Sequence, residues 1–467
     1  MTAGLMSRRI EVSPRRWILL PIGFALKQRE FDGNAMLAFE AAERGWGTIL
    51  GHKAIRYRAD LPCGMHIEKN IAPGTSPKMA NTLGLGRKLS ACCEEGLVYN
   101  NAEEYGRRKI EPDAYDLLER FFCWGESHAR DMVQTLSCDG DKIVVTGNPR
   151  FDLHRPELRA VFAERVERIR RKYGPYILIT TKFSQHNGYV SKDTALQQMR
   201  AIGKVQNTAQ EEEARGQMAF HRAGFMGFME AIDAISRRYP DHTIIVRPHP
   251  SERHDPWQAK AATLKNVEVL CEGNVAEWIL GAELLIHNNC TTGVEAFLLG
   301  KAAISYRPLC DPRFDLWLPN ALSAEAFNLE QLVELVGKVL GGEDIAAGTD
   351  AAAKAETARH FLANFDGKLA CAKILDALDA ADLPEEPLSF PAGLLNDLRV
   401  TARNGMRQLK RSFSGSEFVA LRRSHALRRD DVSGAEIAEF LATARTVTGR
   451  FGNVQVAQLE KNLVCVY

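Results

Sequence analysis

The stretch Thr243–Glu252 reads Thr-Ile-Ile-Val-Arg-Pro-His-Pro-Ser-Glu, and it decides the fold class of this chain. Its first four residues predict a buried β-strand. The two prolines that follow lack the N–H donor that a strand interior needs, so we expect the strand to end at Arg247-Pro248-His249. At the carboxyl edge of a sheet, an arginine and an imidazole suit a phosphate or pyrophosphate. A proline-rich turn with a capping histidine is the alternative.

A second stretch, His287–Ala296, follows about 40 residues later and reads His-Asn-Asn-Cys-Thr-Thr-Gly-Val-Glu-Ala. The apolar run Leu284–His287 predicts a strand that passes through small polar residues into a helix at Gly293–Leu299. Backbone N–H groups and hydroxyls at a helix start favour an anion. Simple helix capping by a threonine is the alternative. The residues that we expect to contact the nucleotide here are Thr291, Thr292, Gly293 and Glu295, the last through ribose hydroxyls.

The surrounding pattern extends this unit in both directions. Further strands are expected at Tyr176–Thr181, Val267–Leu270 and Ala302–Tyr306, with a long amphipathic helix at Phe220–Arg238. The carboxyl ends of parallel strands are where ligands bind in such sheets. The predicted donor site therefore also takes in Lys182, which closes the first of these strands, and Pro250, which completes the turn after His249.

The first part of the chain repeats the alternation of apolar runs and helical stretches. Alternating β and α elements indicate a parallel sheet covered by helices on both faces. The predicted fold class is thus α/β, with two Rossmann-like domains facing across a cleft and a C-terminal helical extension. The strands expected in the first domain are Trp17–Ile22, Gly47–Leu50, Leu89–Tyr99, Arg120–Trp124 and Lys142–Thr146, with a helix at Asn34–Arg44.

The domain boundaries follow from composition and from the restart of the pattern. We expect a disordered leader at 1–15, an N-terminal Rossmann-like domain at 16–155, a C-terminal Rossmann-like domain with closing helices at 156–382, and a helical basic extension at 383–467. Three prolines mark Leu383–Pro391 as a linker.

Composition is that of an ordinary globular protein: of 467 residues, 45% are hydrophobic and 25% charged. Lys+Arg number 60 against 59 Asp+Glu, a net charge of +1, which disfavours nucleic-acid binding by bulk charge. The ten cysteines form no Cys-x-x-Cys pair, so they indicate buried thiols in a reduced cytosol rather than a disulfide framework. No apolar run reaches the roughly 20 residues that span a bilayer, and a cytoplasmic location is expected.

The balanced total conceals one basic segment, Arg399–Arg429, with nine basic residues and a single acidic one, Glu417. Arg399, Arg403 and Arg407 recur at helical spacing. Two interpretations stay open: a docking surface for anionic lipid at the inner membrane or for a phosphorylated acceptor, and a solvated helix face.

The order of these motifs resembles one known family. The Arg-Pro-His-Pro turn followed by the Thr-Thr-Gly-Val-Glu-Ala helix start is similar to the donor domain of GT-B glycosyltransferases, and more distantly to CDP-glycerol polyol-phosphate transferases and UDP-sugar 2-epimerases. Arg29–Gly33, Glu94–Leu97 and Val145–Asp152 resemble motifs of surface carbohydrate (capsule) biosynthesis proteins. The resemblance covers roughly residues 16–320.

The resemblance implies a glycosyltransferase that moves a sugar, such as a Kdo- or sialic-type acid, from a CMP-, CDP- or UDP-linked donor to a surface polysaccharide or lipid-linked glycan. By that comparison His249 contacts phosphate and Thr291, Thr292 and Glu295 contact the nucleotide. Glu94-Glu95-Gly96 is similar to a Glu-Asp-Gly motif that carries a catalytic acid, with Glu95 in place of Asp. A CDP-alditol-dependent polyol-phosphate transferase and a non-catalytic membrane-associated assembly scaffold are the alternatives.

Glycosyl transfer needs a base for the acceptor hydroxyl or a carboxylate nucleophile. The acidic residues beside strand ends of the first domain are Glu30, Asp32, Glu94 and Glu95. Two like charges close together would raise one pKa toward neutrality. Asp32 as a helix N-cap in a solvated loop, and an exposed pair at 94–95, are the alternatives.

Three further residues are assigned to the cleft: Arg29, Asn148 and Arg150. The sequence has no Asp-x-Asp at a strand end and no metal-ligand spacing of His and Cys, so we predict no essential metal and no cofactor beyond the nucleotide-sugar substrate. The phosphate-cradling patterns GxGxxG and Walker A are also absent, which disfavours dehydrogenases and P-loop enzymes.

Overall fold

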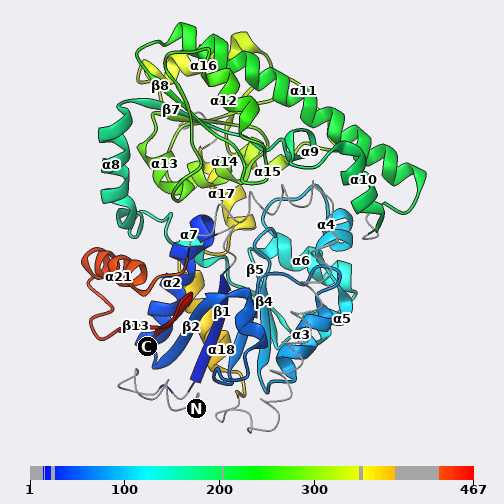
Figure 1. Ribbon diagram of the computed structural model, residues 1–467, viewed down its shortest axis with the longest axis vertical. Coiled ribbons are helices and arrows are strands. Elements are labelled where there is room, and N and C mark those ends of the chain that lie inside the picture. Colours follow the sequence, from blue (N-terminus) through cyan, green and yellow to red (C-terminus); the bar gives the residue numbers. More distant parts are fainter. Residues whose placement is uncertain (1–13, 15, 23–26, 202–204, 346–350, 384–430) are drawn as a thin grey trace. The chain divides into compact units, whose positions relative to one another are not determined.

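The computed structural model describes residues 14, 16–22, 27–201, 205–345, 351–383 and 431–467 (Figure 1). These residues form two compact units, each with its own sheet. Unit 1 holds 14–161, 359–383 and 431–467, and unit 2 holds 162–358. The predicted α/β class with two Rossmann-like units is confirmed. The cleft between them stays a prediction, and the basic segment Arg399–Arg429 lies outside the described residues.

The sheet of unit 1 has eight strands in the order β13-β14-β2-β1-β3-β4-β5-β6. The strands β1 to β6 are parallel, and β1 is buried at every position after Arg16, as a strand covered on both faces requires. These strands are β1 (Arg16–Ile22), β2 (Trp46–His52), β3 (Met65–Glu68), β4 (Lys88–Cys92), β5 (Arg120–Cys123) and β6 (Ile143–Val145).

Helices of unit 1 cover both faces of this sheet. An apolar core on one face joins α3, α4, α5 and α6 to β4 and β5. The long α2 instead packs against α7, α18 and α21. The helices are α2 (Lys27–Glu43), α3 (Ser76–Leu83), α4 (Ala102–Lys109), α5 (Pro112–Asp116), α6 (Glu126–Leu136), α7 (Pro149–Asp152), α18 (Ala370–Asp379) and α21 (Gly434–Thr448), with 3-10 turns η2 (Lys53–Tyr57) and η3 (Arg159–Phe162).

The C-terminal end of the chain contains strands that the prediction of a helical extension did not include. After α21, strands β13 (Val456–Glu460) and β14 (Leu463–Val466) form a hairpin, and β14 pairs antiparallel with β2. All four β14 residues are buried, and Leu463 and Cys465 join the core of Trp17, Leu19 and Ile49. Because all four residues of this short run are buried, it forms an inner strand between β13 and β2 and leaves β13 at the edge of the sheet.

The sheet of unit 2 is parallel throughout, in the order β12-β11-β10-β7-β8-β9. One face packs against α11, α12 and α16 in a single core. Figure 1 shows α11 as the long green helix of this unit. The strands are β7 (Tyr176–Thr180), β8 (Thr243–Arg247), β9 (Val267–Val269), β10 (Leu284–His287), β11 (Ala303–Tyr306) and β12 (Ala324–Ala326).

The helices of unit 2 complete the alternation with the strands. They are α8 (Ala163–Tyr173), α9 (Ser184–Asn187), α10 (Lys192–Ala201), α11 (Thr208–Arg238), α12 (Asp255–Ala261), α13 (Val275–Gly281), α14 (Thr291–Leu298), α15 (Trp317–Ala321) and α16 (Leu329–Leu340). Helix α17 (Ala351–Phe361) then leads the chain out of unit 2 and back into unit 1.

The boundaries differ from those predicted at 155/156 and 382/383. The units divide at Val161/Phe162, and residues after Ala358 return to unit 1 rather than closing unit 2. The anchor of this return is Asp152, whose carboxylate accepts hydrogen bonds from the backbone N–H groups of Ala370 (2.8 Å) and Cys371 (2.9 Å) at the start of α18. A contact across 218 residues of sequence leaves no local signal that a pattern could detect.

Candidate functional site

The carboxyl edge of the unit 2 sheet brings three predicted segments together. Because β10, β7 and β8 are adjacent and parallel, the residues that follow them meet at one edge. The backbone N–H of Lys182, after β7, donates to Asn288 Oδ1, after β10, at 2.9 Å. The hydroxyls of Thr180 and Thr292 lie 2.8 Å apart. Lys182, Thr291, Thr292 and the turn of His249 therefore belong to one region of unit 2.

The His249 ring is fixed in one tautomer by its own turn. Its Nδ1 accepts a hydrogen bond from the backbone N–H of Ser251 at 3.2 Å and lies 2.6 Å from the Ser251 hydroxyl. A nitrogen that accepts from an N–H carries no proton, so in the neutral ring the proton is on Nε2. With Pro250 between them, His249 and Ser251 form a compact turn whose imidazole can donate through Nε2 to a phosphate oxygen.

Arg247, predicted to contact phosphate, has a different role in this structure. Its side chain is buried and donates to the carbonyl oxygens of Glu272 and Gly273, the latter at 2.6 Å, and its guanidinium lies 5.9 Å from the Trp278 ring centre. Burial also lowers the pKa of Arg247. The guanidinium holds the 272–273 loop, and the structure gives no support to a direct phosphate contact.

Helix α14 begins as an anion site would require. Its N-cap residue is Cys290, which makes no side-chain capping bond, so the alternative of capping by Thr291 or Thr292 is wrong. Asn289, just before it, adopts φ 44°, the left-handed region. A Cβ on Gly293 would lie 2.4 Å from His287 Nε2, so only glycine lets the first turn approach β10 this closely. The first turn of α14 thus lies at the sheet edge without a side-chain cap, and its helix dipole favours an anion there.

Glu295 lies on the buried side of α14 and is only 2% exposed. A ribose hydroxyl would have to reach a carboxylate that the rest of unit 2 covers. Its position favours a role inside the fold over the predicted ribose contact.

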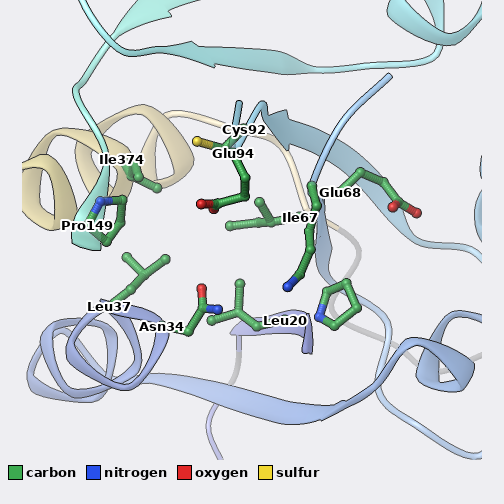
Figure 2. A pocket seen from close by; sticks show the side chains of 11 residues that line it. Leu20, Asn34, Leu37, Ile67, Glu68, Cys92, Glu94, Pro149 and Ile374 are labelled. Atoms are coloured by element: carbon green, nitrogen blue, oxygen red, sulfur yellow. The ribbon is translucent and has the colours of Figure 1, made fainter. Parts of the chain in front are cut away.

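Unit 1 carries a pocket at the carboxyl ends of β1, β3 and β4 (Figure 2). The empty space, counted out to the solvent at its mouth, is about 410 Å³. In Figure 2 the carboxylate of Glu94 and the amide of Asn34 point into this space, whereas the Glu68 carboxylate points away. Glu94 Oε2 is buried and has no hydrogen-bond partner. A buried acceptor without a donor is costly, so this oxygen is suited to a ligand hydroxyl.

The predicted residues Glu30 and Asp32 lie inside α2, not in a solvated loop, and both are buried. The alternative of Asp32 as a helix N-cap is therefore wrong. Glu30 is paired with Lys69 and lies 3.4 Å from Arg29 Nη2. Burial lowers the pKa of Lys69 to about 8. A carboxylate that two cations already neutralise is a poor base, and Glu30 is better explained as their counter-ion.

Glu95 differs from its neighbour Glu94. It is exposed, forms an ion pair with Lys109, and its pKa is lowered by the Lys109 charge against the opposing effect of burial. The expectation that the pair would raise one pKa is wrong for Glu95. Of the four predicted carboxylates, Glu94 alone lines the pocket.

Asn148 and Arg150, assigned to the cleft, are both buried in unit 1. Asn148 caps α7 by accepting from the Arg150 N–H at 3.0 Å, and its amide donates to Cys92 Sγ at 3.5 Å. A Cβ on Gly33 of α2 would lie 2.7 Å from the Arg150 nitrogen. This turn thus packs α7 closely on α2.

Three residues of the two sites were missed by the sequence reasoning: Lys69 and Asn34 at the pocket, and Glu252 in the His249 turn. Glu252 had a signal, since it ends the quoted stretch. Lys69 follows β3, which the sequence reasoning did not identify as a strand. Among the described residues, no group of three or more His, Cys, Asp or Glu could hold a metal. No described helix has the length and apolarity to cross a membrane.

Comparison with known proteins gives structural similarity only. No protein-family model and no curated protein matches this sequence. The UDP-GlcNAc 2-epimerase of Neisseria meningitidis bound to UDP-GlcNAc is 12% identical over 78% of this chain and 99% of its own, with a TM-score of 0.48. The UDP-GlcNAc 2-epimerase of Methanocaldococcus jannaschii is 14% identical over 78% of this chain and 99% of its own, with a TM-score of 0.48.

A variant of the wall teichoic acid polymerase TagF is 11% identical over 79% of this chain and 89% of its own, with a TM-score of 0.47. At these values the similarity concerns the order of elements in an α/β fold. The function that we propose for this protein therefore rests on the contacts of its own side chains.

Proposed function

We propose that this protein is a glycosyltransferase that moves a sugar from a nucleotide donor to a hydroxyl of a surface polysaccharide or lipid-linked glycan. The observation that carries the proposal is the His249 ring, with its proton on Nε2, at the same sheet edge as the N-terminus of α14, which has no side-chain cap. The His249 Nε2–H and the first backbone N–H groups of α14 are neutral hydrogen-bond donors. Together with the dipole of α14, they suit the phosphates of a nucleotide.

The chemistry assigned to unit 2 is stabilisation of the leaving group. As the bond between the anomeric carbon and the donor phosphate breaks, negative charge grows on the phosphate oxygens. Donation from His249 Nε2 and from the first N–H groups of α14 favours that charge. Lys182, whose backbone is fixed by Asn288, adds a positive charge to the same region.

The chemistry assigned to unit 1 is proton removal from the acceptor. The new bond forms between the acceptor oxygen and the anomeric carbon, and the hydroxyl proton passes to Glu94 Oε2, the buried oxygen without a partner. Asn34, which points into the same space, would hold a neighbouring hydroxyl of the acceptor.

Calorimetric titration with CMP, CDP and UDP tests the donor site. We expect at least one of them to bind, and H249A to weaken its Kd by about 10- to 100-fold, because a charge-assisted hydrogen bond is lost. The control is H242A, at the opposite end of β8, which should leave Kd unchanged. If the unmodified protein binds none of the three at millimolar concentration, the donor site assignment fails.

A donor screen with product analysis tests the reaction. We expect E94Q to lower kcat by about 100-fold with unchanged nucleotide Kd, and E103Q, on the exposed surface of α4, to behave as the unmodified enzyme. Loss in E95Q but not in E94Q would move the base to Glu95. A phosphodiester in the product, instead of a glycosidic bond, would identify polyol-phosphate transfer, and nucleotide binding without any turnover would favour a scaffold.

A further inference from the structure

One buried carboxylate connects the two loops that form the donor site of unit 2. Glu252, which is fully buried, lies in the turn after β8. Its Oε1 accepts from the Thr181 hydroxyl (2.9 Å), the Phe183 N–H (2.8 Å) and the His249 N–H (3.4 Å). Its Oε2 accepts from Trp257 Nε1 (3.2 Å) and Asn187 Nδ2 (3.5 Å).

Every one of these five partners is a donor. A carboxylate satisfies all five at once, whereas a neutral carboxylic acid could direct its proton only to the Thr181 hydroxyl, the one partner that also accepts, and would lose that donor. Burial raises the pKa of Glu252, and the hydrogen bonds from Phe183, Thr181, Trp257 and Asn187 oppose that rise. The network therefore depends on the charged form.

The partners of Glu252 flank the groups assigned to the donor. Thr181 and Phe183 lie on either side of Lys182 in the sequence, and the His249 N–H belongs to the residue whose ring is assigned to the donor phosphate. The same turn is fastened a second time, because the Arg253 N–H donates to the Asn187 carbonyl at 2.8 Å and Asn187 Nδ2 donates to the Arg253 carbonyl at 2.9 Å. Glu252 itself is too deeply buried to contact a ligand.

We propose that Glu252 is the positioning residue of the donor site, and that it sets the affinity for nucleotide phosphates by fixing His249 relative to Lys182. This inference rests on the proposed function. Binding groups that are held in place before the ligand arrives lose little conformational freedom on binding. A displacement of such a group by about 1 Å lowers a reaction rate by as much as about 100-fold. The charge-neutral E252Q variant keeps the shape but replaces one acceptor oxygen by an NH₂ group, which then faces either the three donors at Oε1 or the two at Oε2.

The first measurement is nucleotide affinity in the folded protein. We expect E252Q to weaken the Kd for the best-bound nucleotide by about 10-fold or more. The matched control is D152N in unit 1, because Asp152 is also a buried carboxylate that accepts only from donors, at Asn364, Ala370 and Cys371. We expect D152N to lower Tm without changing Kd. Equal Kd values for E252Q and the unmodified protein would overturn the proposal.

The second measurement needs no ligand, so it separates this proposal from the proposed function. Nitrogen NMR of the His249 ring should report the proton on Nε2 in the unmodified protein and a shifted ring signal in E252Q, because a weaker acceptor for the His249 N–H displaces the turn that holds Ser251 against Nδ1. If E252Q fails to fold, E252D keeps the charge but shortens the side chain, and an intermediate Kd with a shifted ring signal is expected. An unchanged His249 signal in a folded Glu252 variant would refute the positioning role, even if no nucleotide binds.

Discussion

The turn after β6 in unit 1 and the turn after β8 in unit 2 are built alike but do different things. Each leaves a parallel strand, contains proline, and ends in a buried carboxylate that accepts hydrogen bonds from donors elsewhere in the fold. In unit 1 the acceptor Asp152 holds the start of α18. In unit 2 the acceptor Glu252 holds the loops that carry Lys182 and His249. The partners of the carboxylate, not the turn itself, separate a structural joint from a binding site.

Gly147, at the start of the unit 1 turn, is the most demanding position in this comparison. It has φ 83°, and a Cβ there would lie 2.1 Å from Asn364 Oδ1. We expect G147A to lower the free energy of unfolding by about 3 kcal/mol or more, since backbone strain and a clash add. Urea denaturation followed by circular dichroism measures this.

The control for that substitution is G45A. Gly45 has a similar φ of 80°, but nothing lies within 4 Å of its Cβ position. Only the strain of about 1 kcal/mol should remain there. Equal losses in the two variants would mean that the contact with Asn364 contributes nothing to the joint.

D152N tests the joint through its hydrogen bonds. Three donors, Asn364 Nδ2 and the N–H groups of Ala370 and Cys371, would lose a charged acceptor. We expect a loss of about 2–3 kcal/mol in the free energy of unfolding, with nucleotide Kd unchanged. A weakened Kd in folded D152N would break the distinction between joint and site.

G293A tests the site of unit 2 through packing. The added methyl group would lie 2.4 Å from His287 Nε2 and would push the first turn of α14 away from the sheet edge. We expect about 2 kcal/mol of destabilisation and a nucleotide Kd weakened about 10-fold. Denaturation and calorimetry give the two values separately.

Gly227 on α11 supplies the matched control. Its Cβ position is 2.7 Å from Pro308 Cγ, so G227A is similarly crowded, but it lies in the middle of a helix that packs on the face of the sheet. We expect a comparable stability loss and an unchanged Kd. If G227A weakens Kd as much as G293A, the effect is general and not specific to α14.

The two units should differ least in how acid lowers the free energy of unfolding, because each contains a buried histidine. Burial lowers the pKa of His128 in unit 1 and of His287 in unit 2 to about 3 each. The unfolded state, with a pKa near 6.5, binds more protons between these values, so the free energy of unfolding falls as pH drops below about 6.5. From pH 7 to pH 5 we expect a loss of about 1–2 kcal/mol per histidine.

Denaturation of H128Q and H287Q at pH 7 and at pH 5 measures the contribution of each histidine to the pH dependence of the free energy of unfolding. Each variant should show a shallower pH dependence than the unmodified protein by about the amount of one histidine. A slope that changes in only one variant would mean that the other ring is protonated without cost in the folded protein.

The sequence reasoning succeeded where the pattern is local. The runs Trp17–Ile22, Tyr176–Thr181 and Leu284–His287 are strands within one residue of their predicted ends. They are continuous apolar stretches bounded by polar or proline-rich residues, and parallel strands buried on both faces need that composition. The gathering of Lys182, His249 and Thr292 follows from strand order in a parallel sheet, which alternation alone implies.

The sequence reasoning failed where a contact joins segments that are distant in the sequence. The C-terminal hairpin is five plus four residues long, and its burial comes from pairing with β2, some 400 residues earlier. The helix predicted from Asn34 in fact begins at Lys27, so the alternative of a solvated loop at Arg29–Asp32 is wrong, and α2 buries Glu30 beside Lys69. Arg247 was assigned to phosphate because its position at a strand end is visible, whereas the carbonyls that it binds are not.

The sequence by itself determined that this chain forms two α/β units, and which strand ends carry imidazole, hydroxyl and carboxylate groups. Those properties depend on periodicity and on the missing N–H of proline, both of which are local. Only the tertiary structure decided which of these groups line a pocket and which are occupied by partners within the fold. It placed Glu94 in a pocket and Glu95 in an ion pair, and it made Glu252 an acceptor for five donors. Burial and hydrogen-bond partners arise from the packing of distant segments, so adjacent and chemically identical residues acquire different roles.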